Sequence, residues 1–158
     1  MAGEFKVIPA GEAARPVIAN LLQLYLYDMA PYFGARLNAA GRYDHDILEE
    51  AWAHPYLFTL EGAPAGFALI TRECTIRERS PCWYVAEFGI LRPYQGRGLG
   101  RRAFQALLEA NPGDWELTWY DGNRPAIAFW PRVIPQAGRE ELRLQVNGMD
   151  WTSVAFTV

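Results

Sequence analysis

The stretch Gln95-Gly96-Arg97-Gly98-Leu99-Gly100 decides how this sequence is interpreted. An apolar run at 83–91, which predicts a strand, precedes it, and residues 101–109, whose spacing predicts a helix, follow it. A strand, a glycine-rich turn and a helix together present bare backbone N–H groups to a phosphate at the helix N-terminus. Glycine lets the backbone turn and lets an anion approach without a Cβ in the way. The stretch therefore predicts a phosphorylated ligand, in preference to a merely solvated Gly/Arg turn.

Two common phosphate loops do not fit this stretch. The string Gly-x-x-x-x-Gly-Lys-Ser/Thr of a P-loop does not occur in the sequence. The dinucleotide fingerprint Gly-x-Gly-x-x-Gly, started at Gly96, meets Arg101 at its third position. Started at Gly98 it meets Ala103, a tolerable variant, but that frame places the loop inside the helix. A nucleotide-binding oxidoreductase is therefore disfavoured, also because no suitable second βαβ unit is present.

The loop does match Gln/Arg-x-x-Gly-x-Gly/Ala, with Gln95, Gly98 and Gly100 in register. This is the pyrophosphate-loop pattern of the GNAT N-acyltransferase superfamily, which the sequence resembles. Residues 87–94 resemble the family's fourth strand running into its turn, and 123–130 resemble its Asn-x-x-Ala-x-x-aromatic-aromatic helix. The likeness covers essentially the whole chain.

The expected elements follow the order of that family. The sequence predicts strands at 5–8, 56–61, 65–72, 83–91, 115–120, 141–146 and 151–157, and helices at 12–29, 46–52, 99–110 and after Asn123. The order β-α-α-β-β-β-α-β-α-β-β implies an α/β (α+β) fold: a mixed, mainly antiparallel sheet of six to seven strands flanked by helices on both faces. The length of 158 residues fits a single domain spanning residues 1–158.

Composition narrows the range of partners. A hydrophobic content of 51% is that of a globular chain, and a net charge of −3 favours neither nucleic acid nor an anionic membrane. The basic residues Arg92, Arg97, Arg101 and Arg102 surround the glycine turn, which suits a small anionic ligand.

The remaining composition signals concern compartment and metal. Cys74 and Cys82 are expected to be free thiols in a reducing cytoplasm, although they could face each other on neighbouring strands. No metal-ligand spacing is present. With no signal segment or spanning run, the cytoplasm is the expected location.

The resemblance implies an acetyl-CoA donor, with no metal. It assigns the coenzyme A contacts to Ile90, Leu91, Arg92, Gln95, Gly96, Arg97, Gly98, Leu99, Gly100, Arg101, Asn123, Phe129 and Trp130. The backbone N–H of Ile90 or Leu91 would polarise the thioester carbonyl. Asn123 could instead be only a helix cap, and Phe129 and Trp130 only core residues.

Glu87 is the candidate general base. It interrupts an apolar strand, which is costly unless the carboxylate is paired or used. Strand alternation places it on the face opposite Phe88 and Ile90. An ordinary ion pair with Arg72 explains it equally well. Glu116 is a weaker candidate and is expected to be solvated.

The sequence differs from the family at the position of the general acid. Many members have a Tyr seven residues after the capping Asn, where this chain has Trp130. An indole N–H cannot deliver a proton in catalysis. Tyr120 or a tyrosine of the first helix could serve, or no acid is needed, because a thiol with a pKa near 8.5 is a fair leaving group. Pro131 is expected to kink or end its helix.

Aromatic and acidic residues gather at 25–45, where the resemblance places the acceptor site. Tyr25 and Asp28 are the candidate acceptor contacts, suited to a cationic amine. The predicted function is acetyl transfer to a primary amine of a small molecule or peptide. The sequence does not decide between a monomer and a homodimer. The alternative is a non-catalytic acyl-CoA-binding module.

Overall fold

The computed structural model describes residues 3–47 and 49–158. Its sheet has seven strands in the order β1-β2-β3-β4-β5-β7-β6, antiparallel throughout except between β4 and β5. The strands are β1 (Phe5–Pro9), β2 (His54–Leu60), β3 (Ala63–Thr71), β4 (Trp83–Ile90), β5 (Asp114–Tyr120), β6 (Glu140–Val146) and β7 (Met149–Thr157). The helices are α1 (Arg15–Phe33), α2 (Leu99–Ala110) and α3 (Arg124–Val133), with short 3-10 turns η1 (Glu12–Ala14), η2 (Glu49–Trp52) and η3 (Arg92–Tyr94).

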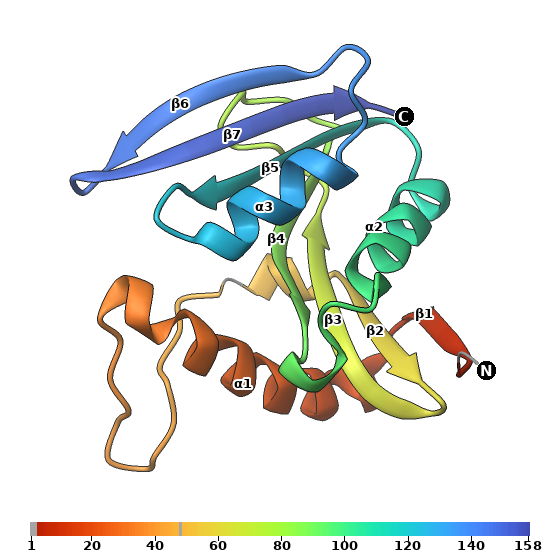
Figure 1. Cartoon of the computed structure of the whole chain (residues 1–158), viewed down its shortest axis with the longest axis vertical. Coiled ribbons are helices and arrows are strands. Elements are labelled where there is room, and N and C mark those ends of the chain that lie inside the picture. Colours follow the sequence, from red (N-terminus) through yellow and green to blue (C-terminus); the bar gives the residue numbers. More distant parts are fainter. Residues whose placement is uncertain (1–2, 48) are drawn as a thin grey trace.

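The helices cover opposite faces of the sheet (Figure 1). Phe104 of α2 and Trp130 of α3 pack with Trp115 on one face, while Ile18 and Leu22 of α1 pack on the other. Strand alternation supplies both cores, because successive side chains of β3 point to opposite faces. This confirms the mixed, mainly antiparallel sheet with helices on both faces.

A bulge and a divergence set β4 apart from the other strands. Leu69 pairs with Glu87 and Ile70 pairs with Val85, so Ala86 is an extra residue on β4. The parallel pairing of β4 with β5 is limited to two register pairs at the start of β4, after which the strands separate (Figure 1). The separation leaves one edge of β4 without a neighbouring strand.

The first helix begins and ends later than expected, and the second expected helix is not formed. α1 runs through Pro31 to Phe33 and ends at Gly34, whose φ of 64° is the left-handed cap conformation. The prediction of a helix at 46–52 is wrong: residues 44–47 have no helical turn, and the 3-10 turn η2 begins at Glu49. Leu48 lies outside the described residues. A segment this short, followed at once by β2, has too few backbone bonds to sustain an α-helix.

The prediction of free thiols is also wrong. Cys74 and Cys82 form a disulfide, because the turn between β3 and β4 folds back on itself through an isolated bridge between Cys74 and Arg79. From this loop Arg77 reaches the Glu116 carboxylate at 3.0 Å and the Ser153 hydroxyl at 2.8 Å. Glu116 is fully buried by this pairing, so the expectation of a solvated carboxylate is wrong as well. None of the described helices has the length and apolar character of a membrane span.

Candidate active site

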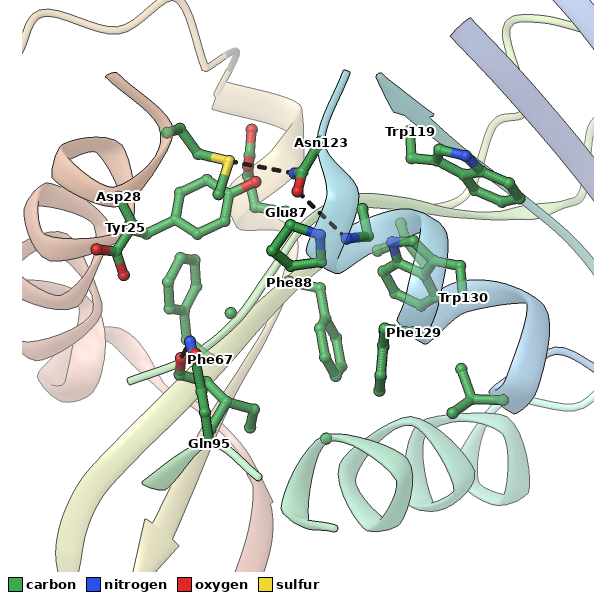
Figure 2. Close-up of a pocket in the computed structure, with 18 of the residues that line it drawn as sticks. Tyr25, Asp28, Phe67, Glu87, Phe88, Gln95, Trp119, Asn123, Phe129 and Trp130 are labelled. Carbon is green, nitrogen blue, oxygen red and sulfur yellow. Dashed lines mark hydrogen bonds between the residues drawn. The ribbon is translucent and has the colours of Figure 1, made fainter. Parts of the chain in front are cut away.

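A cavity of about 960 Å³ opens where β4 leaves β5. It is walled by β4, by the end of β5, by the second half of α1, by α3 and by the glycine turn that leads into α2 (Figure 2). The two predicted halves of the site, the glycine turn and Glu87, therefore border one space.

The backbone of β4 offers free hydrogen-bonding groups to this cavity. Leu91 donates its N–H to the Ala65 carbonyl at 2.8 Å. Because bonded pairs alternate along an antiparallel ladder, Gly89 also bonds toward β3, whereas Phe88 and Ile90 direct their backbone groups away from it. Of the two N–H groups expected to polarise the thioester, that of Leu91 is therefore already engaged, which leaves Ile90.

The turn after β4 is held open by its glycines. Gly96 and Gly98 have φ of 73° and 74°, a region that glycine occupies without strain. A Cβ added at either position would meet nothing within 4 Å, so the turn faces open space. Gly98 is the N-cap of α2, whose first N–H groups have no intrahelical partner. The Gln95 side chain fixes the turn by donating to the Ile90 carbonyl at 2.8 Å.

Two aromatic side chains at the end of α3 border the cavity. Trp130 is buried in the core, edge-on to Phe104 at 5.2 Å and to Phe88 at 5.3 Å, and it also lines the cavity. Phe129 stacks on Phe88 at 5.8 Å and borders the cavity (Figure 2). A Cβ on Gly100 would come within 3.0 Å of the Phe129 ring, so packing between α2 and α3 requires this glycine.

Other predicted contacts have partners of their own. Asn123 caps α3 by accepting from the Ala126 N–H at 3.2 Å, and its amide donates to the Met29 sulfur at 3.6 Å (Figure 2). Arg101 donates to the Arg132 carbonyl at 3.0 Å, which ties α2 to α3. Pro131 lies inside α3, which continues to Val133. The helix therefore ends soon after the proline, as expected.

Glu87 lies half-buried in the cavity wall, on the face opposite Phe88. Burial raises the pKa of Glu87 to about 7. The nearby Tyr25 hydroxyl acts to lower this pKa, and the charge of Asp46 adds to the rise. The alternative ion pair is not formed, because Arg72 stacks over Trp83 at 4.2 Å instead. A carboxylate with a pKa near neutrality can accept a proton at physiological pH.

The predicted acceptor and acid residues also border the cavity. Asp28 is paired with Arg92 at 2.6 Å, so its charge is compensated. Tyr120 packs in an aromatic group with Phe33 and Trp151. The centroid of each of these two rings lies 5.6 Å from that of the Tyr120 ring. Tyr25 directs its hydroxyl toward Glu87 (Figure 2).

Sequence reasoning missed two residues near Glu87. Tyr84 points to the same face as Glu87 because the extra residue Ala86 resets the alternation. Burial raises the pKa of Tyr84, and the charge of Glu87 contributes to that rise. Asp46 lies in an irregular segment, and no sequence pattern predicts that its charge acts on Glu87. No cluster suited to a metal ion is found within residues 3–47 and 49–158.

The comparisons with known proteins agree with this architecture. The family model described as Acetyltransferase (GNAT) family matches residues 21–133, and the chain belongs to this family. A GNAT acetyltransferase from Streptococcus agalactiae has a similar structure, with 13% identity, a TM-score of 0.74 and coverage of 100% of this chain and 98% of that one.

Two further solved structures carry more specific names. Arabidopsis thaliana Naa50, in complex with the bisubstrate analogue CoA-Ac-MVNAL, matches with 17% identity, a TM-score of 0.63 and coverage of 98% and 99% of the two chains. The Escherichia coli ribosomal-protein-S18-alanine N-acetyltransferase matches with 14% identity, a TM-score of 0.63 and coverage of 98% and 94%. At these identities the likeness shows the fold. No curated protein matches the sequence.

Proposed function

We propose that this protein, as a single domain, transfers the acetyl group of acetyl-CoA directly to a primary amine of a small molecule or peptide. The observation that carries the proposal is the meeting, in one cavity, of an open glycine turn, a strand edge with free N–H groups and a carboxylate whose pKa is raised to about 7. Each supplies one requirement of the reaction.

The donor half of the site fits the chemistry of coenzyme A. The open N–H groups of residues 96–101 would hold the pyrophosphate, favoured by the N-terminus of α2. The free backbone groups of Phe88 at the edge of β4 would pair with the amides of the pantetheine arm, since the Ile90 carbonyl already accepts from Gln95. The Ile90 N–H would bind the developing oxyanion, a role worth roughly 3 kcal/mol for one donor. Acetyl-CoA supplies the activated acyl group.

The acceptor half has to deprotonate an ammonium group. Ionised Glu87 would take that proton directly or through water, so that the free amine can attack the thioester carbonyl. The C–N bond forms, the C–S bond breaks, and the sulfur leaves as thiolate or thiol. The indole N–H of Trp130 cannot protonate the sulfur, so Tyr120, which borders the cavity, is the candidate acid.

The acceptor is expected to enter between α1 and the end of β5. Tyr25 and Asp28 line this side together with the aromatic rings of Phe33 and Trp151. Because Arg92 compensates Asp28, the carboxylates of Glu87 and Asp46 supply the negative charge that attracts an amine.

Ligand-induced stabilisation tests the donor half. Acetyl-CoA and coenzyme A should raise the melting temperature, because a ligand that binds only the folded state stabilises it, whereas NAD and ATP should not. No shift at millimolar acetyl-CoA would contradict the proposal.

A non-catalytic acyl-CoA-binding module is the second candidate, favoured by Trp130 in place of the usual tyrosine. The two functions are separated by assaying free thiol during incubation with acetyl-CoA and a broad panel of amines. Thiol release above the rate without enzyme supports the transferase. Stabilisation by acetyl-CoA without any such release supports the binding module.

A further inference from the structure

The ring of Tyr25 is fixed by two neighbours beneath α1. It meets the Phe67 ring edge-on, with 5.7 Å between centroids and 85° between planes. Gly89 lies beside both rings: an added Cβ there would come within 3.0 Å of the Tyr25 ring and 3.4 Å of the Phe67 ring. The absence of a side chain at Gly89 therefore makes room for the tyrosine, and little freedom is left to its ring.

The hydroxyl of this fixed ring is directed at Glu87 (Figure 2). Burial raises the pKa of Tyr25 well above its ordinary value, and the nearby charge of Glu87 adds to the rise. The hydroxyl is therefore protonated at neutral pH and is placed to donate to the Glu87 carboxylate. A donor in this position would hold one carboxylate oxygen and leave the other for the cavity.

The other groups that face Glu87 do not supply this support. Asp46, from the segment after α1, disfavours ionisation of Glu87. Tyr84, on β4 itself, is coupled to Glu87 by charge. Farther along the cavity, Asp28 is held by Arg92, and Tyr120 packs with Phe33 and Trp151. Among the described residues that face Glu87, Tyr25 combines a closely packed ring with a hydroxyl directed at the base.

We propose that Tyr25 is a positioning residue for Glu87: with its ring packed against Phe67 and Gly89, its hydroxyl orients the carboxylate toward the acceptor amine and stabilises its charged form. This inference rests on the proposed function for the role of Glu87 as base. In this role Tyr25 neither binds the acceptor nor exchanges a proton. The positioning role takes the place of the acceptor contact that the sequence predicted for Tyr25.

The direct test is the titration of the Glu87 carboxyl in the full chain, observed by carbon-13 NMR with assignment from Glu87→Gln. In Tyr25→Phe the midpoint should move to higher pH, because the hydrogen bond that favours the charged form is lost. Tyr27→Phe is the matched control, since it removes the same hydroxyl from an exposed position on the same helix. A midpoint in Tyr25→Phe that is unchanged or lowered would overturn the proposal.

Gly89→Ala provides an independent variant, since it displaces the ring and keeps the hydroxyl. Its Glu87 midpoint should also move to higher pH, by less than in Tyr25→Phe. If the Glu87 carboxyl titrated in both variants with the midpoint of the wild type, the packing of Tyr25 would have no effect on Glu87.

Kinetics with an accepted amine give the second readout. Tyr25→Phe should lower kcat about tenfold at pH 7, as expected for loss of one hydrogen bond to a charged group, and move the rising limb of kcat/KM to higher pH. The KM for the amine should stay within about twofold. An increase in KM with kcat unchanged would instead make Tyr25 an acceptor contact. The NMR titration needs no turnover. It therefore tests the effect of Tyr25 on Glu87 even if the protein proves not to transfer acetyl groups.

Discussion

The two sides of β4 differ in the groups that they offer to the proposed substrates. Toward β5 and α2 the strand offers backbone groups, and the adjoining turn is lined by glycines. Toward α1 it presents side chains, with Glu87 and Tyr84 from β4 itself, Tyr25 from the helix and Asp46 from an irregular segment. The donor side thus depends on local backbone conformation, and the acceptor side on side chains gathered from distant parts of the chain. Substitutions should separate these two dependences.

Glu87→Gln should have the largest effect. Loss of the base should lower kcat by about 10² to 10³-fold at pH 8, while the Kd for acetyl-CoA stays unchanged, because the carboxyl lies on the other side of the strand. Steady-state kinetics and calorimetry measure the two quantities. Glu109→Gln, on an exposed face of α2, is the control. A kcat within twofold of wild type would remove Glu87 from the mechanism.

The same substitution should stabilise the protein at high pH. Glu87 has a folded pKa of about 7, above the ordinary 4.5, so the folded state holds the proton more tightly. This contribution is fully present below pH 4.5 and is lost as pH rises through 7, at a cost of up to about 3 kcal/mol. Urea unfolding should therefore show Glu87→Gln gaining stability over wild type between pH 5 and pH 8. A difference between the two proteins that does not change with pH would contradict the shifted pKa.

The disulfide should matter to the fold and not to the donor side. Replacing Cys74 and Cys82 by serine should lower the free energy of unfolding by about 2 to 3 kcal/mol, because a short closed loop no longer restrains the unfolded chain. Acetyl-CoA affinity should be unaffected, since this loop precedes β4 and the glycine turn follows it. Chemical denaturation with and without reductant gives the stability difference. Equal stability would show that the disulfide does not restrain this chain.

Gly98→Ala should weaken acetyl-CoA binding about tenfold, because the left-handed backbone is strained and the Cβ enters the open face of the turn. Gly138→Ala is a matched control: it has a φ of 67° and open surroundings, but it does not line the cavity. Calorimetric titration of both variants should therefore show weakened binding for the first only. Equal losses would attribute the effect to general strain.

The contrast between the two sides also explains what could be predicted from the sequence. The turn at Gln95–Gly100 and the cap at Asn123 are local, so short patterns identify them and the family. The orientation of Glu87 followed from simple alternation. These features depend on neighbours in the sequence.

The remaining features depend on contacts between distant segments. The bulge at Ala86 places Tyr84 beside Glu87, and no residue type announces it. Arg77, in the loop after β3, pairs with Glu116 on β5. The Glu116 carboxylate, which the sequence predicted to be solvated, is therefore fully buried. The contact of Tyr25 with Glu87 likewise needs α1 to be docked on β4.

The central claim, that the donor is held by the backbone of β4 and the following turn, is tested most directly by amide NMR during addition of coenzyme A. The N–H resonances of residues 96–101 and of Phe88 and Ile90 should shift, while that of Gly138 should not. Shifts confined to other parts of the chain, or none at millimolar coenzyme A, would contradict the account.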